Sequence, residues 1–310
     1  MTINSSFILR RTNDYFFKRV FGSEEGKDVL IDFLNAAQNR PPHDRIKSVT
    51  FEDREIDPER YLDKAIRLDV VATTELGHIY QVEVQVTDQV FIDKRSLYYW
   101  STLYHRQLQQ GKLYNDLKPT VSINILGFEW FKEDERYHHV FHLWDDDVRE
   151  KLNDDLELHF MELPKLKHLK RAPQNALEEW LIYLSDIQGE ALEAIAMSNP
   201  AIRKALSIEE MFKANAQERR LYDMREKAVF SEATNVAAAE AKGKAEGKIL
   251  MAQEAINQYL EVRFAAESQS LQQTIHTIND LDTLTRIMNR IFTVDSLDEA
   301  TAFIKDSLLS

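Results

Sequence analysis

The chain has 310 residues, of which 44% are hydrophobic and 29% charged, a composition that fits a globular protein and excludes a disordered one. The formal net charge of −13 excludes strong non-specific binding of nucleic acid by the whole surface, although it leaves room for a local basic groove. The sequence has no apolar stretch long enough to span a membrane, no secretory signal pattern and no cysteine. Disulfides, thiolate zinc sites and cysteine nucleophiles are thereby excluded, and we expect a soluble, cytoplasmic protein.

The first fifty residues show two helical patterns followed by an extended one. Apolar residues recur at helical spacing over 15–21, and Asn13 or Asp14 is placed to cap the N-terminal end of that helix. A second helical pattern covers 29–35. From residue 46 the pattern becomes extended, which predicts a strand through Phe51.

A β-hairpin is predicted next. Apolar residues alternate with polar ones over 65–72 and again over 80–87, and the loop between them ends in Gly77. A helix is expected over 91–110, with Gly111 as its C-cap, and a further strand over 121–125. Helix, strand, hairpin, helix and strand in this order predict an α/β unit with a mixed sheet.

The remaining chain turns from mixed to helical. Strands are expected around 140–143 and 156–161, and nearly everything after residue 176 has a helical pattern. We expect an α/β domain over 1–172, a helical extension over 173–208, a long connector helix over 209–265 and a small helical tail over 266–310. The C-terminal helices are a candidate surface for homo-oligomerisation.

The hairpin brings two acidic residues together. If Val70 faces Val82 on an apolar side, Asp69 lies opposite Glu83 on the other side, with Gln85 two residues further along. Two carboxylates at neighbouring cross-strand positions repel one another, and burial makes the repulsion worse. A divalent cation removes the conflict, and carboxylate oxygens suit Mg²⁺ or Mn²⁺. The alternative interpretation is a pair of solvated polar positions on the outer face of the sheet.

Several segments in this order resemble a known family. The Rpn-type group, called recombination-promoting nucleases or transposases, lies within the PD-(D/E)XK nuclease superfamily. The resemblance is carried by Asp14-Tyr-Phe-Phe-Lys18-Arg-Val-Phe-Gly22, Leu68-Asp69-Val70, Val82-Glu83-Val84-Gln85, Arg95 with Tyr98 and Tyr99, and Tyr114-x-x-Leu117-x-Pro119. It covers residues 10–130 best, and the long Ala/Glu/Lys helix and helical tail also resemble the C-terminal regions of that group.

The resemblance implies a restriction-endonuclease-like core, a mixed sheet flanked by helices, that hydrolyses DNA with Mg²⁺ or Mn²⁺. Asp69 and Glu83 match the two acidic residues of the superfamily motif. Gln85 stands where the superfamily usually has Lys, although Gln is common there in the Rpn-like group. A lysine would orient the attacking water or stabilise charge, whereas a neutral Gln positions groups by hydrogen bonds alone.

Other residues are weaker candidates. The resemblance implies that Asp14, on the first helix, is an extra acid directed toward the metal, and the alternative is a helix cap. Lys18, one turn later, either meets a phosphate or pairs with Asp14. Arg95 and Gln107, on the helix after the hairpin, are candidate DNA contacts, although a surface salt bridge is the commoner use of such an arginine. The aromatic cluster formed by Tyr98, Tyr99, Trp100 and Tyr104 is interpreted as core packing rather than base stacking. A basic run comprises Lys165, Lys167, His168, Lys170 and Arg171 and is a further candidate for backbone contacts.

Two functions follow from these residues. The first is a Mg²⁺-dependent DNA endonuclease that hydrolyses phosphodiester bonds and assists recombination, with Asp69, Glu83 and Gln85 as its catalytic residues. The second is an inactive nuclease fold that serves as a scaffold and oligomerises through its helical tail. The net charge and Gln85 favour the scaffold, whereas the facing carboxylates favour the nuclease.

Overall fold

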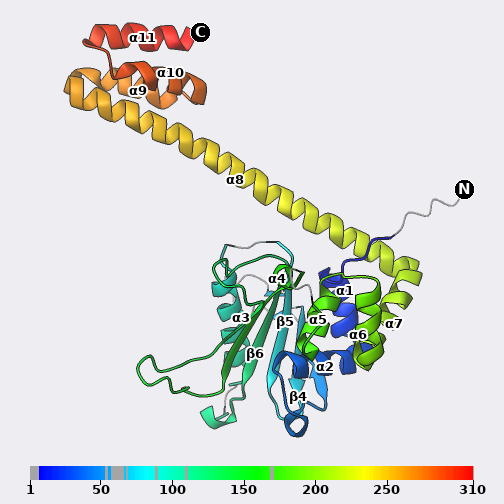
Figure 1. Cartoon of the computed structure of the whole chain (residues 1–310). Helices are drawn as coiled ribbons and strands as arrows, with labels where there is room; N and C mark the ends of the chain where they lie inside the picture. Colours follow the sequence, from blue (N-terminus) through cyan, green and yellow to red (C-terminus); the bar gives the residue numbers. More distant parts are fainter. Residues whose placement is uncertain are drawn as a thin grey trace, which may run out of the picture. The chain divides into compact units, whose positions relative to one another are not determined.

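The computed structural model describes residues 7–52, 55–56, 66–67, 69–87, 90–108, 111–167 and 171–309. The chain forms two compact units, Met1–Lys227 and Ala228–Ser310, and the helix α8 (Ala216–Phe264) contributes to both (Figure 1). In the described residues no helix is long and apolar enough to cross a membrane.

The first unit is built around a six-stranded mixed sheet. Its strands lie in the order β1 (Val49–Phe51), β4 (Val70–Thr74), β5 (Ile79–Gln85), β6 (Thr120–Leu126), β8 (Leu156–Glu162) and β7 (His138–Phe141). The strands β5, β6 and β8 run parallel, and the other neighbouring pairs are antiparallel. A separate two-stranded sheet pairs β2 (Glu55–Ile56) with β3 (Ile66–Arg67).

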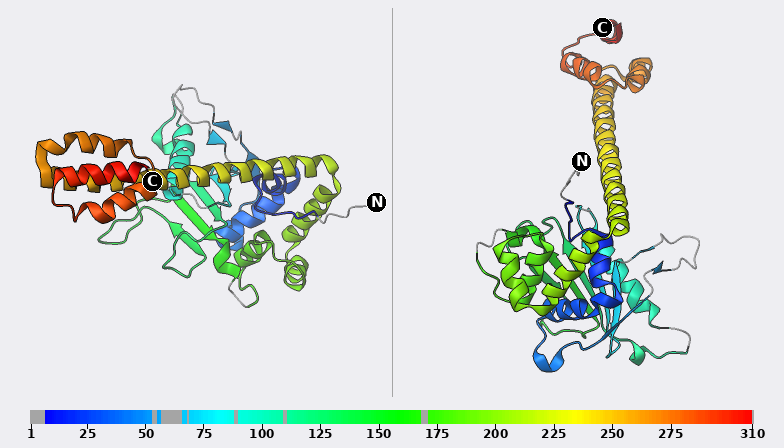
Figure 2. Two further views of the ribbon diagram at one scale, coloured as in Figure 1. Left: turned by 90° about the horizontal axis from the view of Figure 1, so that it is seen from above. Right: turned by 90° about the vertical axis from the view of Figure 1, so that its right-hand side faces the viewer.

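Helices cover both faces of the large sheet (Figure 2, right). One face carries α1 (Asp14–Phe21), α2 (Lys27–Ala37) and α5 (Ala176–Leu184), and α6 (Glu190–Ser198) and α7 (Pro200–Ala214) join the same buried core through contacts with these helices. The other face carries α3 (Ile92–Arg106), which connects β5 to β6. Short helical segments lie at Glu24–Gly26, Pro42–Asp44, Tyr114–Asp116 and Leu163–Lys167, the last being α4.

Alternation along the strands decides which face is apolar. Val82 and Ile123 point into the main core with Phe17 of α1 and Trp180 of α5, and each of these side chains is at most 1% exposed. Their neighbours in sequence are polar and point to the α3 face. The α5–α7 helices share this core with the sheet, since Ile202 and Phe212 belong to the same buried cluster.

The predicted elements of the α/β region are confirmed except at two places. The strand expected over 65–72 is divided, because Ile66–Arg67 pair with β2 and only β4 pairs with β5, and α3 ends earlier than expected. Asn13, rather than Asp14, is the N-cap of α1, and its side chain accepts hydrogen bonds from the backbone N–H groups of Tyr15 and Phe16. The α3 helix ends at Arg106 with Gln107 as its C-cap, so the expected extension to residue 110 and the Gly111 cap are wrong. The Gln107 side chain is bonded to Lys118 and Thr120, which ties this end of the helix to the start of β6.

The second unit has its own small core. The C-terminal part of α8 is followed by a short 3-10 turn at Ala265–Ser268 and by α9 (Gln269–Thr277), α10 (Leu281–Ile291) and α11 (Leu297–Leu309). Fully buried side chains on α8, α9, α10 and α11 meet there, among them Ile256, Ile275, Ile287 and Ile304. The expected helical C-terminal region is therefore confirmed, and its core includes residues of α8 as well as the three helices that follow. The side chains of 231–246 on α8 are exposed.

Candidate active site

The predicted hairpin register is confirmed. Val70 pairs with Val82, and Val71 pairs with Gln81, in the antiparallel ladder between β4 and β5. Asp69 directly precedes this ladder and lies beside Glu83. Leu68, which the same predicted register places opposite Val84, lies outside the described residues.

The two acidic residues are buried and hold one another's backbone. Asp69 is 6% exposed and Glu83 is 2% exposed, so the interpretation as solvated outer positions is wrong. The Asp69 N–H donates to Glu83 Oε1 at 2.9 Å, and the Val84 N–H donates to Asp69 Oδ2 at 3.0 Å. Each carboxylate therefore satisfies a backbone donor of the opposite strand, which fixes the orientation of both side chains.

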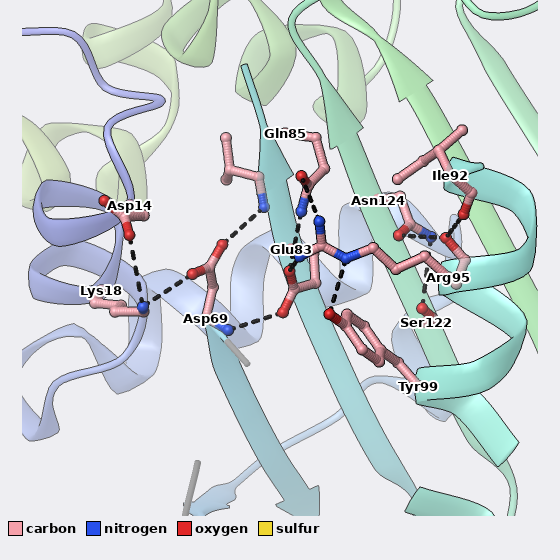
Figure 3. Close-up of polar contacts among 12 residues, drawn as sticks. Asp14, Lys18, Asp69, Glu83, Gln85, Ile92, Arg95, Tyr99, Ser122 and Asn124 are labelled. Carbon is pink, nitrogen blue, oxygen red and sulfur yellow. Dashed lines mark hydrogen bonds and ion pairs between the residues drawn. The ribbon is translucent and has the colours of Figure 1, made fainter. Parts of the chain in front are cut away.

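Cations and an amide surround the pair (Figure 3). Lys18 Nζ lies 2.9 Å from Asp69 Oδ1, and Arg95 Nη2 lies 3.7 Å from Glu83 Oε2. Gln85 Nε2 donates to Glu83 Oε2 at 3.1 Å, and the Gln85 Oε1 atom accepts from Arg95 Nη1 at 3.3 Å. The site thus draws together α1, the β4–β5 hairpin and α3.

Burial makes the two negative charges costly. It raises the pKa of Asp69 above its ordinary value, although Lys18 acts in the opposite direction. Burial is also the main cause that raises the pKa of Glu83 to about 8, and the neighbouring Asp69 charge raises it further. Two acids held this close in a buried place keep both charges more easily when a further cation joins them.

The donor set suits a hard divalent cation. Mg²⁺ commonly takes one or two protein carboxylates and completes its shell with water and phosphate oxygens, and Asp69 and Glu83 supply such a pair. No group of three or more His, Cys, Asp or Glu side chains is placed to hold a metal ion in the part of the chain that the structure describes. Asp14 is therefore not brought together with the other two acids as a third ligand.

Asp14 has a different set of partners. Both of its carboxylate oxygens lie 2.8 Å from Arg225 Nε, and its Oδ2 atom lies 3.9 Å from Lys18 Nζ. Lys18 consequently lies between Asp14 and Asp69 (Figure 3). Of the two roles that the sequence left open for Lys18, the pairing with Asp14 is present as the longer contact, the short contact is to the Asp69 carboxylate, and a contact with phosphate stays a prediction.

Other predicted DNA contacts lie elsewhere or serve the fold. Gln107 is bonded at Thr120, whereas Glu83 is paired with Asn124 four residues further along β6, so the structure does not bring Gln107 to the carboxylates. Lys165 is enclosed: its ammonium pairs with Glu162 at 2.7 Å and also donates to the backbone oxygens of Phe131 and Asp134. Its expected role as a backbone contact for DNA is therefore wrong.

The rest of the basic run gives a similar result. Arg171 pairs with Glu178 through both of its terminal nitrogens, at 2.6 and 2.8 Å. His168 and Lys170 lie outside the described residues, as does the side chain of Lys167. The structure therefore provides no basic groove from the described part of this run.

The aromatic cluster on α3 divides between two environments. Trp100 stacks on Tyr104 at 5.0 Å and donates its indole N–H to the Thr120 carbonyl, as expected for packing. Tyr98 is 48% exposed, so the core interpretation is wrong for this residue. Tyr99 accepts a hydrogen bond from Arg95 Nε at 2.9 Å and so helps to orient that arginine beside Glu83.

Sequence reasoning missed the polar row beneath α3. Ser122 and Asn124 alternate with buried apolar residues on β6, and Asn124 Oδ1 accepts a hydrogen bond from Ser96 of α3. Gln81 is fully buried, and neither of its amide atoms has a hydrogen-bond partner among the described residues. The sequence does contain a signal for this row, because polar residues recur at every second position of β6, as they do on β5.

The family comparison agrees with this arrangement. A family model described as PD-(D/E)XK nuclease family transposase matches residues 11–239, which include both strands of the hairpin, α1 and α3. The chain belongs to the PD-(D/E)XK nuclease family transposases. The resemblance found in the sequence is thereby confirmed, and the mixed sheet with flanking helices is the restriction-endonuclease-like fold of that family. No match was found among curated proteins or among solved structures.

Proposed function

We propose that this member of the PD-(D/E)XK nuclease family transposases hydrolyses phosphodiester bonds in DNA with the help of Mg²⁺ or Mn²⁺. The observation that carries the proposal is the pair of buried carboxylates, Asp69 and Glu83, held on one face of adjoining strands by the hydrogen bonds of the hairpin itself. A scaffold gains nothing from two facing acids in a buried place, since their repulsion destabilises the fold.

Each residue has a stated task. Asp69 and Glu83 would hold the divalent cation between the two strands. What such a cation supplies when bound is neutralisation of charge at the phosphate and a bound water of lowered pKa. The Gln85 amide, which is already oriented by Glu83 and Arg95, positions the attacking water or a phosphate oxygen by hydrogen bonds. Arg95 provides a guanidinium suited to the DNA backbone beside the site.

The proposal is tested by nicking of supercoiled plasmid with Mg²⁺ or Mn²⁺. We expect Asp69→Asn and Glu83→Gln each to reduce cleavage by at least about 100-fold, because each removes one ligand of the proposed ion. Asp154→Asn is the matched control: this acid is paired with Lys151 on the surface, its side chain is 83% exposed, and its loss should leave cleavage unchanged.

Calorimetry separates the nuclease from the scaffold. Uptake of Mn²⁺ by the native chain that disappears in Asp69→Asn supports the site. The nuclease function is contradicted if all variants cleave equally, or if the native chain does not cleave at any metal concentration. Either result favours the scaffold function, which the net charge of −13 and the neutral Gln85 also favour. Promotion of recombination, self-association through the C-terminal helices and a cytoplasmic location stay predictions.

A further inference from the structure

We propose that Lys18 of α1 is a catalytic residue of this site and supplies the positively charged donor that Gln85 cannot provide. The inference rests on the proposed nuclease function and adds a residue from outside the hairpin to it. Lys18 would donate an N–H from its ammonium to the scissile phosphate or to the attacking water.

The site needs such a donor because hydrolysis of a phosphodiester increases negative charge beside two carboxylates. A charge-assisted hydrogen bond is about twice as strong as one from a neutral amide, and it is worth most in a place from which water is excluded. Gln85 follows Glu83 on the same face of β5 but is neutral, and its amide is engaged by Glu83 and Arg95. Position 85 therefore orients its neighbours without adding charge.

Two cations are ion-paired with the carboxylates among the described residues, and their surroundings differ. Arg95 is held by Tyr99 at 2.9 Å and by Gln85 at 3.3 Å, and it reaches Glu83 only at 3.7 Å. Lys18 Nζ makes the closer contact, at 2.9 Å from Asp69 Oδ1. Lys18 is therefore the cation nearer to the carboxylates where the ion would bind.

Lys18 also keeps donor capacity for a substrate. An ammonium has three N–H donors, and the described contacts of Lys18 are the short one to Asp69 and the long one of 3.9 Å to Asp14. Its side chain is 16% exposed, which is enough for a phosphate to reach it and little enough to hold its position. Phosphate oxygens at the carboxylates would thus lie within reach of this ammonium.

The fold prepares the position of Lys18. The α1 helix is anchored by Phe16, Phe17 and Val20, all at most 1% exposed, and it is capped by Asn13. Asp14, one turn before Lys18, is fixed by Arg225, and its Oδ2 atom lies 3.9 Å from the ammonium. Asp14 is accordingly a positioning residue for Lys18.

A merely structural role makes a different prediction. If Lys18 only neutralises Asp69, its removal changes folding stability and metal affinity, and a lysine placed at position 85 does not restore the rate. If Lys18 acts on the phosphate or the water, a charge introduced at position 85, on the other side of the acids, recovers part of the lost rate.

The test compares Lys18→Met, Lys18→Arg and the double variant Lys18→Met/Gln85→Lys in single-turnover cleavage of a short DNA duplex at saturating Mn²⁺. Metal uptake by calorimetry and thermal unfolding are measured for each variant. We expect Lys18→Met to lower the rate by about 100-fold or more, the range for loss of one transition-state donor. Lys18→Arg should keep more of the rate than Lys18→Met, and the double variant should recover at least tenfold over Lys18→Met.

Controls keep these outcomes separable. Lys27→Met removes a lysine of α2 that pairs with Glu24, and its rate should equal that of the native chain. If Lys18→Met does not fold, Lys18→Gln replaces it in both the single and the double variant. A rate within threefold of native for the neutral variant overturns the proposal, as does a loss that Gln85→Lys does not reverse.

Failure of the nuclease function is recognised separately. In that case the native chain itself does not cleave, whatever the state of position 18, and the role of Lys18 falls with it. When the native chain cleaves DNA and takes up Mn²⁺, the nuclease function stands, and the variants at positions 18 and 85 test only the catalytic role of Lys18.

Discussion

The two faces of the central sheet are built from the same strands but have opposite chemistry. Toward α1, α2 and α5, the strands β5 and β6 present Val82 and Ile123 to a continuous apolar core. Toward α3, the adjacent residues are Glu83 and Asn124, which are buried as deeply and are polar. The difference shows how one run of alternating residues stabilises the fold on one side and leaves the other side to carry destabilising charge.

The apolar face should respond to truncation with the largest loss of stability. Ile123 is fully buried in the main core, and Ile123→Ala leaves a cavity there. We expect the free energy of unfolding to fall by about 2–5 kcal/mol, measured by urea unfolding. The cleavage rate per folded molecule should stay near native, and a rate loss larger than the folded fraction explains would show that the two faces are not independent.

The polar face should respond to neutralisation in the opposite direction. Burial raises the pKa of Glu83, so its contribution to stability is present below the ordinary value of 4.5 and is lost as the pH rises toward about 8. At pH 8 without metal, Glu83→Gln should raise the free energy of unfolding by roughly 2–4 kcal/mol, because the pKa of Glu83 lies several units above its ordinary value and each unit is worth ~1.4 kcal/mol.

The pH profile checks the cause of that stabilisation. The advantage of Glu83→Gln should shrink as the pH falls from 8 to 4.5, because the carboxyl of the folded chain binds its proton near pH 8 and that of the unfolded chain only near 4.5. Saturating Mn²⁺ should stabilise only the native chain. A variant less stable than the native chain at pH 8 would mean that the hydrogen bonds of the carboxylate outweigh its desolvation.

The apolar part of the α3 face should give the smallest effect. Val71 is 1% exposed and belongs to a small cluster with Ile79, Leu103 and Tyr99, separate from the main core. Val71→Ala should cost about 1.6 kcal/mol, the transfer free energy of two methylene groups. A cost equal to that of Ile123→Ala, measured in the same urea series, would indicate that this small apolar cluster under α3 is packed as tightly as the main core.

Local patterns in the sequence were sufficient for the hairpin. The alternation on either side of Gly77 predicts that Val70 pairs with Val82, and the same register places Asp69 beside Glu83. Cap residues such as Asn13 are likewise readable, because their effect depends on the next three residues of the chain. The end of α3 was missed because Gln107 bonds to the start of β6, which lies beyond any helical pattern.

Contacts between distant segments were beyond the sequence. Lys165 belongs to a basic run in the sequence, yet its ammonium is enclosed by Glu162 and by the loop that precedes β7. Arg11 is fully buried against Glu209, 198 residues away, so α7 joins the core of the first unit. The pattern of charges and the helical periodicity of a sequence describe the neighbours of a residue along the chain. They do not indicate which distant residue neutralises its charge.

The sequence by itself therefore determined the family, the alternating hairpin and the acids that share its polar face, because a period of two is a property of neighbouring residues. Only the tertiary structure decided that these acids are buried, that Lys18 lies between Asp14 and Asp69, and that Arg95 is oriented by Tyr99. Those decisions depend on how α1 and α3 pack on the sheet, and packing is set by contacts among residues far apart in the chain.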